Sequence, residues 1–370
     1  MAKIIIFSNK HRADDNRLVE LEAKPIAYKG HTVVLYGNTD GIDISNTVYK
    51  VKRGGRRNKE CIKQCLDEDG DLYIFQDPGL LSCAAKIQKR GKKAIFDSHE
   101  NYEEKIKTRL TNRIPILKPC KKIIGKTWWI YEHHYIKQLS GKICADRTVL
   151  AKYGDRTFLL PNMPSKEFYS NLPEKSSQRD NYSIIYVGTI TWDRGIIEAA
   201  EAIQLCKHEN VKLQIIGDTR DEKLKSKLQA YPNVVWNGRV EWRKLKDYLV
   251  NADIGIVLLQ PTEAYYYCPG ENIVKLWEYM SVGLPVLLSD FPALRKLNDE
   301  LKFGMTVKPD DVQEIANKID WMLDNPEIIT QMGKNGRELV SQKYNAENYT
   351  AELLKFLETI MLENENENKN

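Results

Sequence analysis

Two acidic residues and a lysine fall within a few helical turns of the stretch GENIVKLWEYMSVGLPVLLSD, residues 270–290. Lys275 and Glu278 are three residues apart and share one face of a predicted helix, while Glu271 falls in its first turn. The free backbone N–H groups of that turn could receive an anion such as a diphosphate. The alternative is an ordinary amphipathic helix with a solvated Lys–Glu pair, which ends at Gly283 before a buried strand.

The elements that must position this helix follow a regular pattern. Apolar runs alternate with helical stretches, first as KIIIFS, HTVVLYG, DLYIFQ, KAIFDS and TFLLPN, then as SIIYVG, VKLQIIGD, NVVWNG, DIGIVLL, PVLLSD and GMTVKPD. This alternation is typical of a parallel sheet covered on both faces, and it occurs twice. We therefore predict an α/β chain of two doubly wound, Rossmann-like domains. Ligands of such sheets bind outside the carboxyl ends of the strands, so the cleft between the domains is the default site.

The two series are separated by residues 161–183, a polar stretch with several prolines that indicates a linker. We place the N-terminal domain at residues 1–164 and the C-terminal domain at 165–345. A helix expected at about 346–362 could pack back on the N-terminal domain, and the polar tail 363–370 is expected to be disordered.

The composition excludes several classes of protein. The 370 residues are 42% hydrophobic and 29% charged, with no apolar run long enough to span a bilayer. No signal-peptide pattern is present, and seven scattered cysteines indicate reduced thiols, so we expect a cytoplasmic protein. No G-x-G-x-x-G follows a strand and IIGKT lacks the first glycine of a P-loop, which argues against dehydrogenases and P-loop kinases. A net charge of +5 without a nucleic-acid motif does not favour nucleic acid as a partner.

The stretch KLWEYMSVGLPVLLSDFPALR, residues 275–295, resembles the signature of glycosyltransferase family 4, the retaining GT-B enzymes. The similarity continues in register through DDNRLVELEAKPIAYKGHTV, DPGLL, KKAIFDSHENY, LLPNMP, IIYVGTITWDRGI, NVVWNGRVEWRKLKDYLVNADIGIVLL and GMTVKPDDVQEIANKI. The resemblance implies a GT-B fold, with an N-terminal domain that binds the acceptor and a C-terminal domain that binds a nucleotide sugar.

The resemblance also implies donor contacts in the C-terminal domain. It assigns Glu278 to the ribose hydroxyls, for which a carboxylate is a natural acceptor, and Lys275 and Arg194 to the diphosphate as catalytic cations. Gly188 and Thr189 belong to the same site, although relatives usually carry an arginine where this chain has Thr189.

Two further stretches complete the implied donor site. Arg239 and Val240 match a segment whose backbone meets the base in relatives, and Glu271, Asn272 and Ile273 begin the signature helix. Gly270 occupies the position of the first glutamate in relatives that carry two. Glu271 is displaced from it, and an ordinary helix-terminal charge is the alternative role for this residue.

In the N-terminal domain, His99 follows a buried strand and matches the family's cleft histidine near the transferred sugar, which makes it the third catalytic candidate. Asp77, Glu100 and Arg17 are candidates for the acceptor side of the cleft. A lone histidine is often structural and Asp-Pro is also a plain turn signal. Arg17 could compensate for the glycines that the first loop lacks.

A basic cluster at residues 105–126 holds eight Lys or Arg and no acidic residue, and tryptophans follow it. Cations with interfacial aromatic residues suit an anionic membrane surface. The predicted membrane patch consists of Lys118, Lys121, Lys122, Lys126, Trp128 and Trp129. The alternative is a solvated helix pair with core tryptophans.

These observations predict a retaining hexosyltransferase that moves a sugar from a nucleoside diphosphate sugar to a glycan or polyprenyl-linked acceptor in cell-surface polysaccharide synthesis. We expect peripheral contact with the cytoplasmic face of an anionic membrane, no cofactor and, as in the family, no metal site. A sugar-nucleotide epimerase of the same fold is one alternative. Another, suggested by Thr189 and Gly270, is a non-catalytic nucleotide-sugar-binding subunit of a partner transferase.

Overall fold

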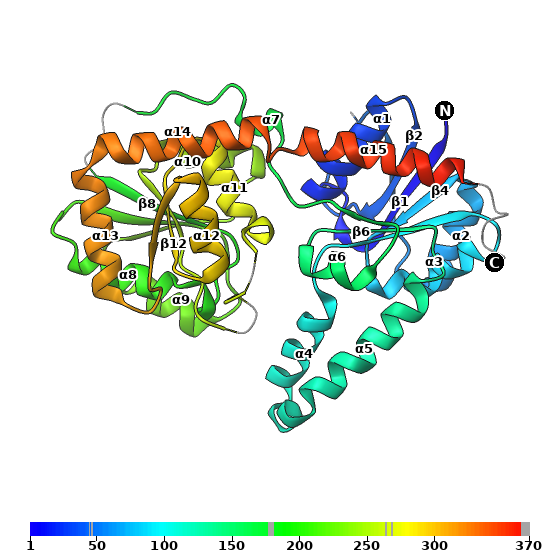
Figure 1. The fold of residues 1–370 in the computed structure, drawn as a ribbon, viewed down its shortest axis with the longest axis horizontal. Coiled ribbons are helices and arrows are strands. Elements are labelled where there is room, and N and C mark those ends of the chain that lie inside the picture. Colours follow the sequence, from blue (N-terminus) through cyan, green and yellow to red (C-terminus); the bar gives the residue numbers. More distant parts are fainter. Residues whose placement is uncertain (44, 46, 177–180, 263–264, 268, 364–370) are drawn as a thin grey trace. The chain divides into compact units, whose positions relative to one another are not determined.

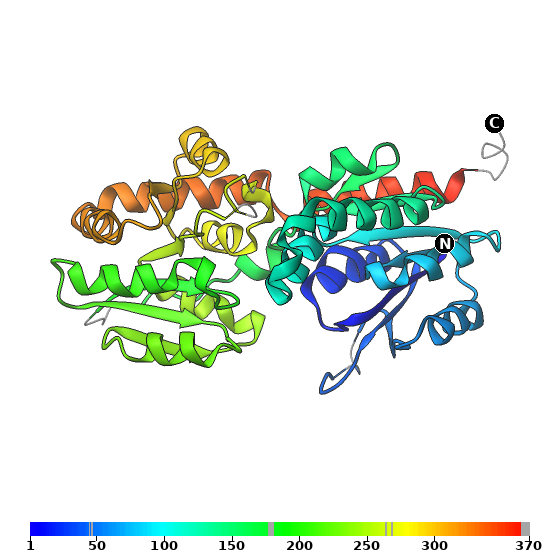
Figure 2. The same cartoon turned by 90° about the horizontal axis from the view of Figure 1, so that it is seen from below.

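The computed structural model describes residues 1–43, 45, 47–176, 181–262, 265–267 and 269–363. They form two compact units (Figures 1 and 2). Unit 1 comprises Met1–Asn162 together with the residues from Ala346 on, and unit 2 comprises Met163–Asn345. The chain therefore changes unit at Asn162, close to the boundary placed at 164 from sequence, and it returns to unit 1 at Ala346. The expected disordered tail, 363–370, lies outside the described residues apart from its first residue.

Unit 1 is built on a seven-stranded parallel sheet in the order β3-β2-β1-β4-β5-β6-β7 among the described residues. The strands are β1 (Lys3–Arg12), β2 (Thr32–Asn38), β3 (Lys50–Arg53), β4 (Leu72–Phe75), β5 (Lys93–Ser98), β6 (Gly141–Cys144) and β7 (Thr157–Leu159). The helices are a π-helical segment η1 (Arg17–Ala23), α1 (Lys24–Tyr28), α2 (Asn58–Glu68), η2 (Pro78–Leu80), α3 (Leu81–Gln88), α4 (Tyr102–Arg113), η3 (Pro115–Cys120), α5 (Lys121–Ile136), α6 (Arg147–Tyr153) and α15 (Ala346–Leu362).

Both faces of this sheet are buried because successive side chains of a strand point to opposite faces. Ile5 and Phe7 of β1 join a core with α2, α3 and α5, while Ile4 and Ile6 join a second core with η1, α1 and α15. The C-terminal helix α15 thus covers a face of the N-terminal sheet. The ammonium group of Lys93 fixes its end by donating to the carbonyls of residues 360, 361 and 363 at 2.7–2.8 Å.

Unit 2 repeats the architecture with a six-stranded parallel sheet in the order β10-β9-β8-β11-β12-β13 within the described part of the chain. Its strands are β8 (Tyr182–Val187), β9 (Val211–Ile216), β10 (Val234–Gly238), β11 (Ile254–Val257), β12 (Val286–Ser289) and β13 (Gly304–Val307). Its helices are α7 (Lys166–Tyr169), η4 (Trp192–Arg194), α8 (Ile196–Leu205), α9 (Glu222–Gln229), α10 (Trp242–Asn251), η5 (Gly270–Asn272), α11 (Val274–Ser281), α12 (Pro292–Leu301), α13 (Val312–Asp324) and α14 (Pro326–Gln342).

Two sequence expectations need correction. The stretch expected to be a linker contains α7, whose Phe168 is buried and stacks on Trp242 at 4.7 Å, so this part of the stretch packs on unit 2. The helix expected from residue 271 begins only at Val274, because η5 is a separate 3₁₀ turn with Ile273 between the two elements. Glu271 therefore does not lie in the first turn of α11.

Helices α4 and α5 form a helical hairpin, residues 102–136, that projects from the sheet of unit 1 (Figure 1). Its tip exposes large apolar side chains, with Ile116 83% and Ile123 67% exposed. No helix in the described part of the chain has both the length and the apolar character needed to cross a bilayer.

We expect Leu357→Ala in α15 to lower the free energy of unfolding by about 2–5 kcal/mol, because Leu357 is fully enclosed in the core of unit 1 and its loss leaves a cavity. Urea titration measures the change, and hydrogen exchange should show lost protection in β1 and β2. The matched control Leu362→Ala, at a side chain 79% exposed, should change stability by less than about 0.5 kcal/mol. Equal effects of the two substitutions would contradict this packing.

Candidate functional site

The order of the strands in each sheet identifies one candidate ligand-binding position in each unit. In unit 2 the chain leaves β8 towards β9 on one side, while β11 lies on the other side of β8. In unit 1 the same reversal occurs between β1 and β4. Loops that diverge from the carboxyl ends of such strand pairs leave a crevice in doubly wound sheets. Polar side chains gather at both positions, and each group is described within its own unit.

Glycines follow β8 and β9 and allow the two strand ends to approach each other closely. Gly188 has φ +125° and Gly217, after β9, has φ +148°, conformations that side chains rarely adopt. A Cβ at Gly217 would lie 1.9 Å from the carbonyl oxygen of Gly188. Thr189 contributes its backbone carbonyl, which accepts a 2.6 Å hydrogen bond from the hydroxyl of Tyr186. The two strand ends therefore approach each other as only glycine allows.

Lys275 of α11 reaches this loop from the other side of the reversal. Its side chain is buried, and its ammonium nitrogen lies over the ring of Tyr186, 3.7 Å from the centroid. A Cβ placed on Gly188 would lie 3.3 Å from the same nitrogen. Burial, and then the positive charge of Arg194, lower the pKa of Lys275 well below its ordinary value, and Glu278 only partly opposes them. The position thus lacks a full counter-charge.

Arg194, in η4 after β8, supplies the second cation. Its guanidinium carbon lies 4.8 Å from the centroid of the Tyr265 ring, a cation–π distance. Its Nε is buried and has no hydrogen-bond partner among the described residues. A buried unpaired donor is costly unless a ligand satisfies it. Arg194 and Lys275 together therefore favour an anion at the carboxyl end of β8.

Glu278 is buried one turn after Lys275, which excludes the solvated Lys–Glu pair considered from the sequence. One of its carboxylate oxygens accepts a 3.1 Å hydrogen bond from the indole N–H of Trp242. Burial raises the pKa of Glu278, although the Trp242 hydrogen bond and Lys275 oppose the shift. Trp242, the first residue of α10, was not identified from the sequence. Trp242 lies in the sequence NGRVEWRKL, and only the folded chain brings its indole ring next to Glu278.

The remaining predicted donor residues lie in loops of unit 2. Arg239 is exposed and Val240 half-buried after β10, at the carboxyl edge of the sheet. Glu271 and Asn272 belong to η5, and Ile273 is the buried N-cap of α11. The side-chain oxygen of Asn272 is buried without a partner in the described structure.

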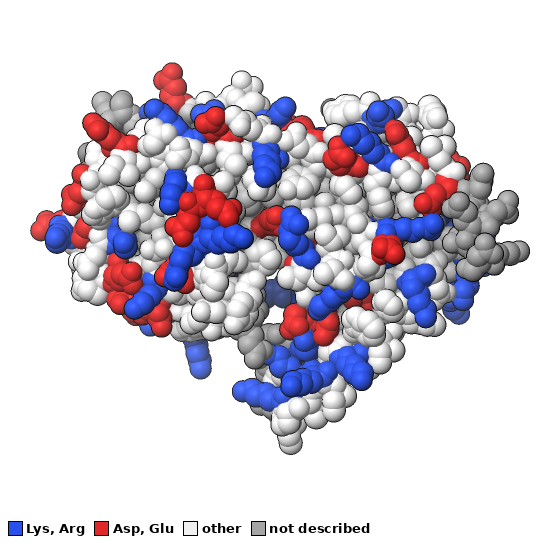
Figure 3. Space-filling model, viewed as in Figure 1, with Lys and Arg blue, Asp and Glu red and all other residues white. Residues whose placement is uncertain are grey.

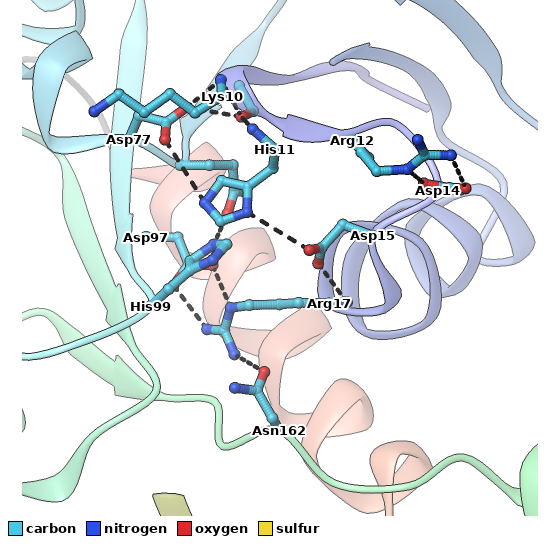
Figure 4. A network of polar contacts seen from close by, with 12 residues as sticks. Lys10, His11, Arg12, Asp14, Asp15, Arg17, Asp77, Asp97, His99 and Asn162 are labelled. Atoms are coloured by element: carbon cyan, nitrogen blue, oxygen red, sulfur yellow. Dashed lines mark hydrogen bonds and ion pairs between the residues drawn. The ribbon is translucent and has the colours of Figure 1, made fainter. Parts of the chain in front are cut away.

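In unit 1, polar side chains gather at the ends of β1, β4 and β5 (Figure 4). Asp77, which is buried after β4, accepts hydrogen bonds from the Ser8 hydroxyl at 2.7 Å and from the backbone N–H of Asn9 at 2.8 Å. Its other oxygen lies 3.6 Å from His11 Nε2. Asp77 therefore both shapes the end of β1 and faces an imidazole.

His11 is the residue of this group that sequence analysis missed. Its ring lies 4.4 Å from that of His99, centroid to centroid, and its Nδ1 lies 3.5 Å from Asp15 (Figure 4). Burial lowers the pKa of His11, but Asp15, Asp77 and Asp97 together outweigh burial and raise it above 6.5. The sequence signal was present in SNKHRADDNR, where His11 and Asp15 are four residues apart.

His99 follows β5, and its ring is fixed by side chains of neighbouring residues. Its Nε2 pairs with the side-chain oxygen of Gln76 and lies 3.3 Å from Asp97. Asp97 is fully buried in a two-bond ion pair with Arg17, at 2.7 Å for each bond. Burial would raise the pKa of Asp97, but Arg17 and His99 outweigh it and lower that pKa strongly.

The place of Arg17 corrects an expectation. Its guanidinium is buried and also donates to the Leu160 carbonyl at 2.6 Å and to the Asn162 side chain at 3.0 Å. The group is thus engaged inside unit 1 and does not present an open fork to a diphosphate. Glu100, the other candidate here, is exposed and pairs with Lys105.

The hairpin divides the predicted membrane patch. Lys118, Lys122 and Lys126 are exposed, as is Trp129 at 39%, and Figure 3 shows Lys and Arg gathered over this region. Lys121 is half-buried. Trp128 packs against the core of unit 1, so its expected place at a membrane surface is wrong. Among the described residues, no group of three or more His, Cys, Asp or Glu is arranged to hold a metal ion.

Comparisons with known proteins agree with this architecture. Residues 170–339 match the family model of the glycosyl transferases group 1. An uncharacterized glycosyltransferase of Methanocaldococcus jannaschii is 29% identical over 47% of this chain and 44% of its own length. The capsular polysaccharide biosynthesis glycosyltransferase CapM of Staphylococcus aureus is 27% identical over 56% of this chain and 53% of its own. The chain thus spans about half the length of these curated relatives.

The crystal structure of HepE from Anabaena in complex with UDP-glucose superposes with a TM-score of 0.72 at 14% identity, covering 97% of this chain and all of that one. Identity this low establishes the fold alone. Most of unit 2 therefore matches the glycosyl transferases group 1, and the chain as a whole has the two-domain GT-B fold.

Proposed function

We propose that this protein is a retaining, family 4-type glycosyltransferase that moves a hexosyl group from a nucleoside diphosphate sugar to a glycan or lipid-linked acceptor in polysaccharide synthesis. The observation that carries the proposal is the pair of under-compensated cations in unit 2. Lys275 is buried with a strongly lowered pKa, and Arg194 has a buried donor that no other described residue satisfies. The match of residues 170–339 to group 1 transferases and the CapM relative support the same class.

In this proposal each donor group meets a matching side chain. Arg194 and Lys275 bind the diphosphate and stabilise the negative charge that grows on it as the bond to the sugar breaks. Glu278 accepts hydrogen bonds from the ribose hydroxyls, and Trp242 fixes its carboxylate through one oxygen, leaving the other available. Arg239 and Val240 contact the base.

The acceptor step uses unit 1. An acceptor hydroxyl binds at the carboxyl ends of β1, β4 and β5, where His99, His11 and Asp77 lie. Its oxygen bonds to the anomeric carbon on the face that the diphosphate leaves, and its proton passes to the departing phosphate oxygen. The configuration at the anomeric carbon is then retained. No metal or cofactor is assigned to this step. At the hairpin, exposed lysines and isoleucines support peripheral contact with the cytoplasmic face of an anionic membrane.

A two-stage assay tests the function. Thermal shifts with UDP, GDP, ADP and their sugars identify the donor, and release of the nucleoside diphosphate with membrane-lipid extract then measures transfer. Donor epimerisation without any acceptor would instead identify an epimerase. Nucleotide binding that never leads to nucleoside diphosphate release would identify a non-catalytic subunit. Absence of all nucleotide binding would overturn both the proposal and these alternatives.

Glu278→Gln should weaken nucleoside diphosphate binding by about tenfold or more, because the uncharged amide loses charge-assisted hydrogen bonds to the ribose. Binding of inorganic pyrophosphate, which lacks a ribose, should change much less. Isothermal calorimetry measures both ligands. The matched control is Glu300→Gln, an exposed carboxylate of α12 outside the proposed donor site, which should leave nucleotide binding unchanged. If nucleotide affinity is unchanged in Glu278→Gln, Glu278 does not belong to the donor site.

Donor binding should take up protons at a pH that lies between the pKa of Lys275 in the free protein and its pKa in the complex. Burial and Arg194 lower the pKa of Lys275 in the free protein, and a diphosphate beside Lys275 would raise it again. At a pH between the two values, binding therefore protonates Lys275. Calorimetry in buffers of different ionisation enthalpy measures this uptake, which Lys275→Met should abolish. Uptake that persists in Lys275→Met would assign the proton to another group.

Stability should fall as pH rises above 6.5 through loss of the His11 proton. The pKa of His11 is raised in the folded state, so its contribution is complete below 6.5 and is lost as pH rises through the higher folded value. Thermal unfolding across this range should be flatter with pH in His11→Gln than in the unsubstituted protein. His134→Gln, at an exposed position outside the network, is the control. A pH profile that is identical in His11→Gln and the unsubstituted protein would contradict the proposed network.

A further inference from the structure

A cavity of about 340 Å³ lies at the helical hairpin of unit 1, away from the polar group at the strand ends. Helix α4 lines it with Glu103 and Lys107, and α6 adds Lys152. Helix α5 contributes Lys122, Lys126 and Trp129, which are spaced four and three residues apart and so share one face of the helix. Four ammonium groups thus surround one cavity.

Two of the four lysines are neutralised and two are not. Glu103 pairs with Lys107 at 3.3 Å and with Lys152 at 2.9 Å, and Lys107 also pairs with Glu104. Within the described residues, Lys122 and Lys126 have no carboxylate at ion-pair distance. The cavity therefore retains two uncompensated positive charges, both on the same face of α5.

Close contact between the two helices fixes these groups. Gly125 is buried in α5, and a Cβ at this position would lie 2.6 Å from Cδ of Lys107 and 3.1 Å from a carboxylate oxygen of Glu103. Because Gly125 has no side chain, Glu103 and Lys107 of α4 lie directly against α5. Gly125 itself lies between Lys122 and Lys126 in the sequence. The ion-paired wall of the cavity is thus held in place before any ligand arrives.

The surroundings indicate where such an anion would come from. Trp129 stacks on His133 with ring centroids 4.7 Å apart, which gives a flat aromatic surface beside the two free lysines. Ile123 directly follows Lys122 and is 67% exposed, and Ile114 and Ile116 are exposed at the same tip. Lysines beside a tryptophan and exposed isoleucines suit an anion at the boundary of a lipid phase.

We propose that this cavity binds the phosphate or diphosphate headgroup of a membrane lipid, with the isoleucines of the hairpin tip in the lipid. Two ammonium groups match a phosphate that carries more than one negative charge better than the single charge of a phosphodiester. In the proposed transferase, this lipid would be the carrier of the acceptor. That identification rests on the proposed function, whereas the headgroup site itself does not.

The test compares the purified protein on phosphatidylcholine vesicles that contain phosphatidic acid, a phosphomonoester lipid, or phosphatidylglycerol, a phosphodiester lipid, at equal surface charge. Co-sedimentation measures binding. The unsubstituted protein should bind the phosphatidic acid vesicles more tightly. Lys122→Gln with Lys126→Gln should weaken that binding by about tenfold or more, and should remove the preference for phosphatidic acid. Lys122→Arg with Lys126→Arg should restore the binding, which a general folding defect would not allow.

The matched control is Lys89→Gln with Lys137→Gln, which removes the same charge from exposed lysines outside both the cavity and the predicted membrane patch. Equal losses in the two double variants would mean a diffuse electrostatic surface and overturn the cavity as a site. Calorimetry with inorganic pyrophosphate provides the second arm, in which only the binding that is lost in Lys122→Gln with Lys126→Gln is assigned to this cavity. Such binding without preference among the vesicles would indicate a soluble phosphate ligand and overturn the lipid headgroup. Nucleotide binding is measured separately, so its failure counts against the proposed function and leaves the headgroup result intact.

Discussion

The buried ion pair between Arg17 and Asp97 organises the carboxyl edge of the first sheet. It ties the π-helical segment after β1 to the end of β5, and through the Leu160 carbonyl it also reaches the chain that leaves β7. Removing one partner of such a pair typically costs about 3–5 kcal/mol, because the other charge stays buried and unpaired. The lowered pKa of Asp97 keeps it ionised beneath His99, so the imidazole sits on a fixed negative charge.

The two units use charge in opposite ways at equivalent places. In unit 1 two buried carboxylates at the strand ends are satisfied: Asp97 by Arg17, and Asp77 by the Ser8 hydroxyl and backbone N–H groups. In unit 2 the cations Arg194 and Lys275 lie near each other, and among the described residues Glu278 alone opposes the lowering of the Lys275 pKa. A satisfied network holds its shape without a ligand, whereas an under-compensated one gains free energy when an anion arrives. This contrast assigns the donor diphosphate to unit 2 in our proposal and the neutral acceptor hydroxyl to unit 1.

Much of the fold could be predicted because strands buried on both faces of a parallel sheet require continuous apolar runs in the sequence. All six strands of unit 2 coincide with such runs. Strands β3 (KVKR) and β6 (GKIC) were missed because β3 has a single apolar residue and a lysine interrupts the apolar pattern of β6. The site was harder to predict. Trp242 lies 36 residues from Glu278, and His11 lies in β1 whereas Asp77 follows β4, so only the folded chain brings each pair together.

The helical hairpin also combines a feature that the sequence predicts with one that only the folded chain reveals. A run of basic residues could mean a solvated helix pair or a membrane surface, and sequence alone left both readings open. Trp128 packs inward, as expected of a core tryptophan, while Trp129, one residue later, is exposed beside two lysines that have no ion-pair partner among the described residues. A 100° step along a helix is enough to separate adjacent side chains in this way. Exposed isoleucines cost free energy in water but gain it in lipid, and this difference is why our proposal places the outward face where phosphate headgroups meet an apolar phase.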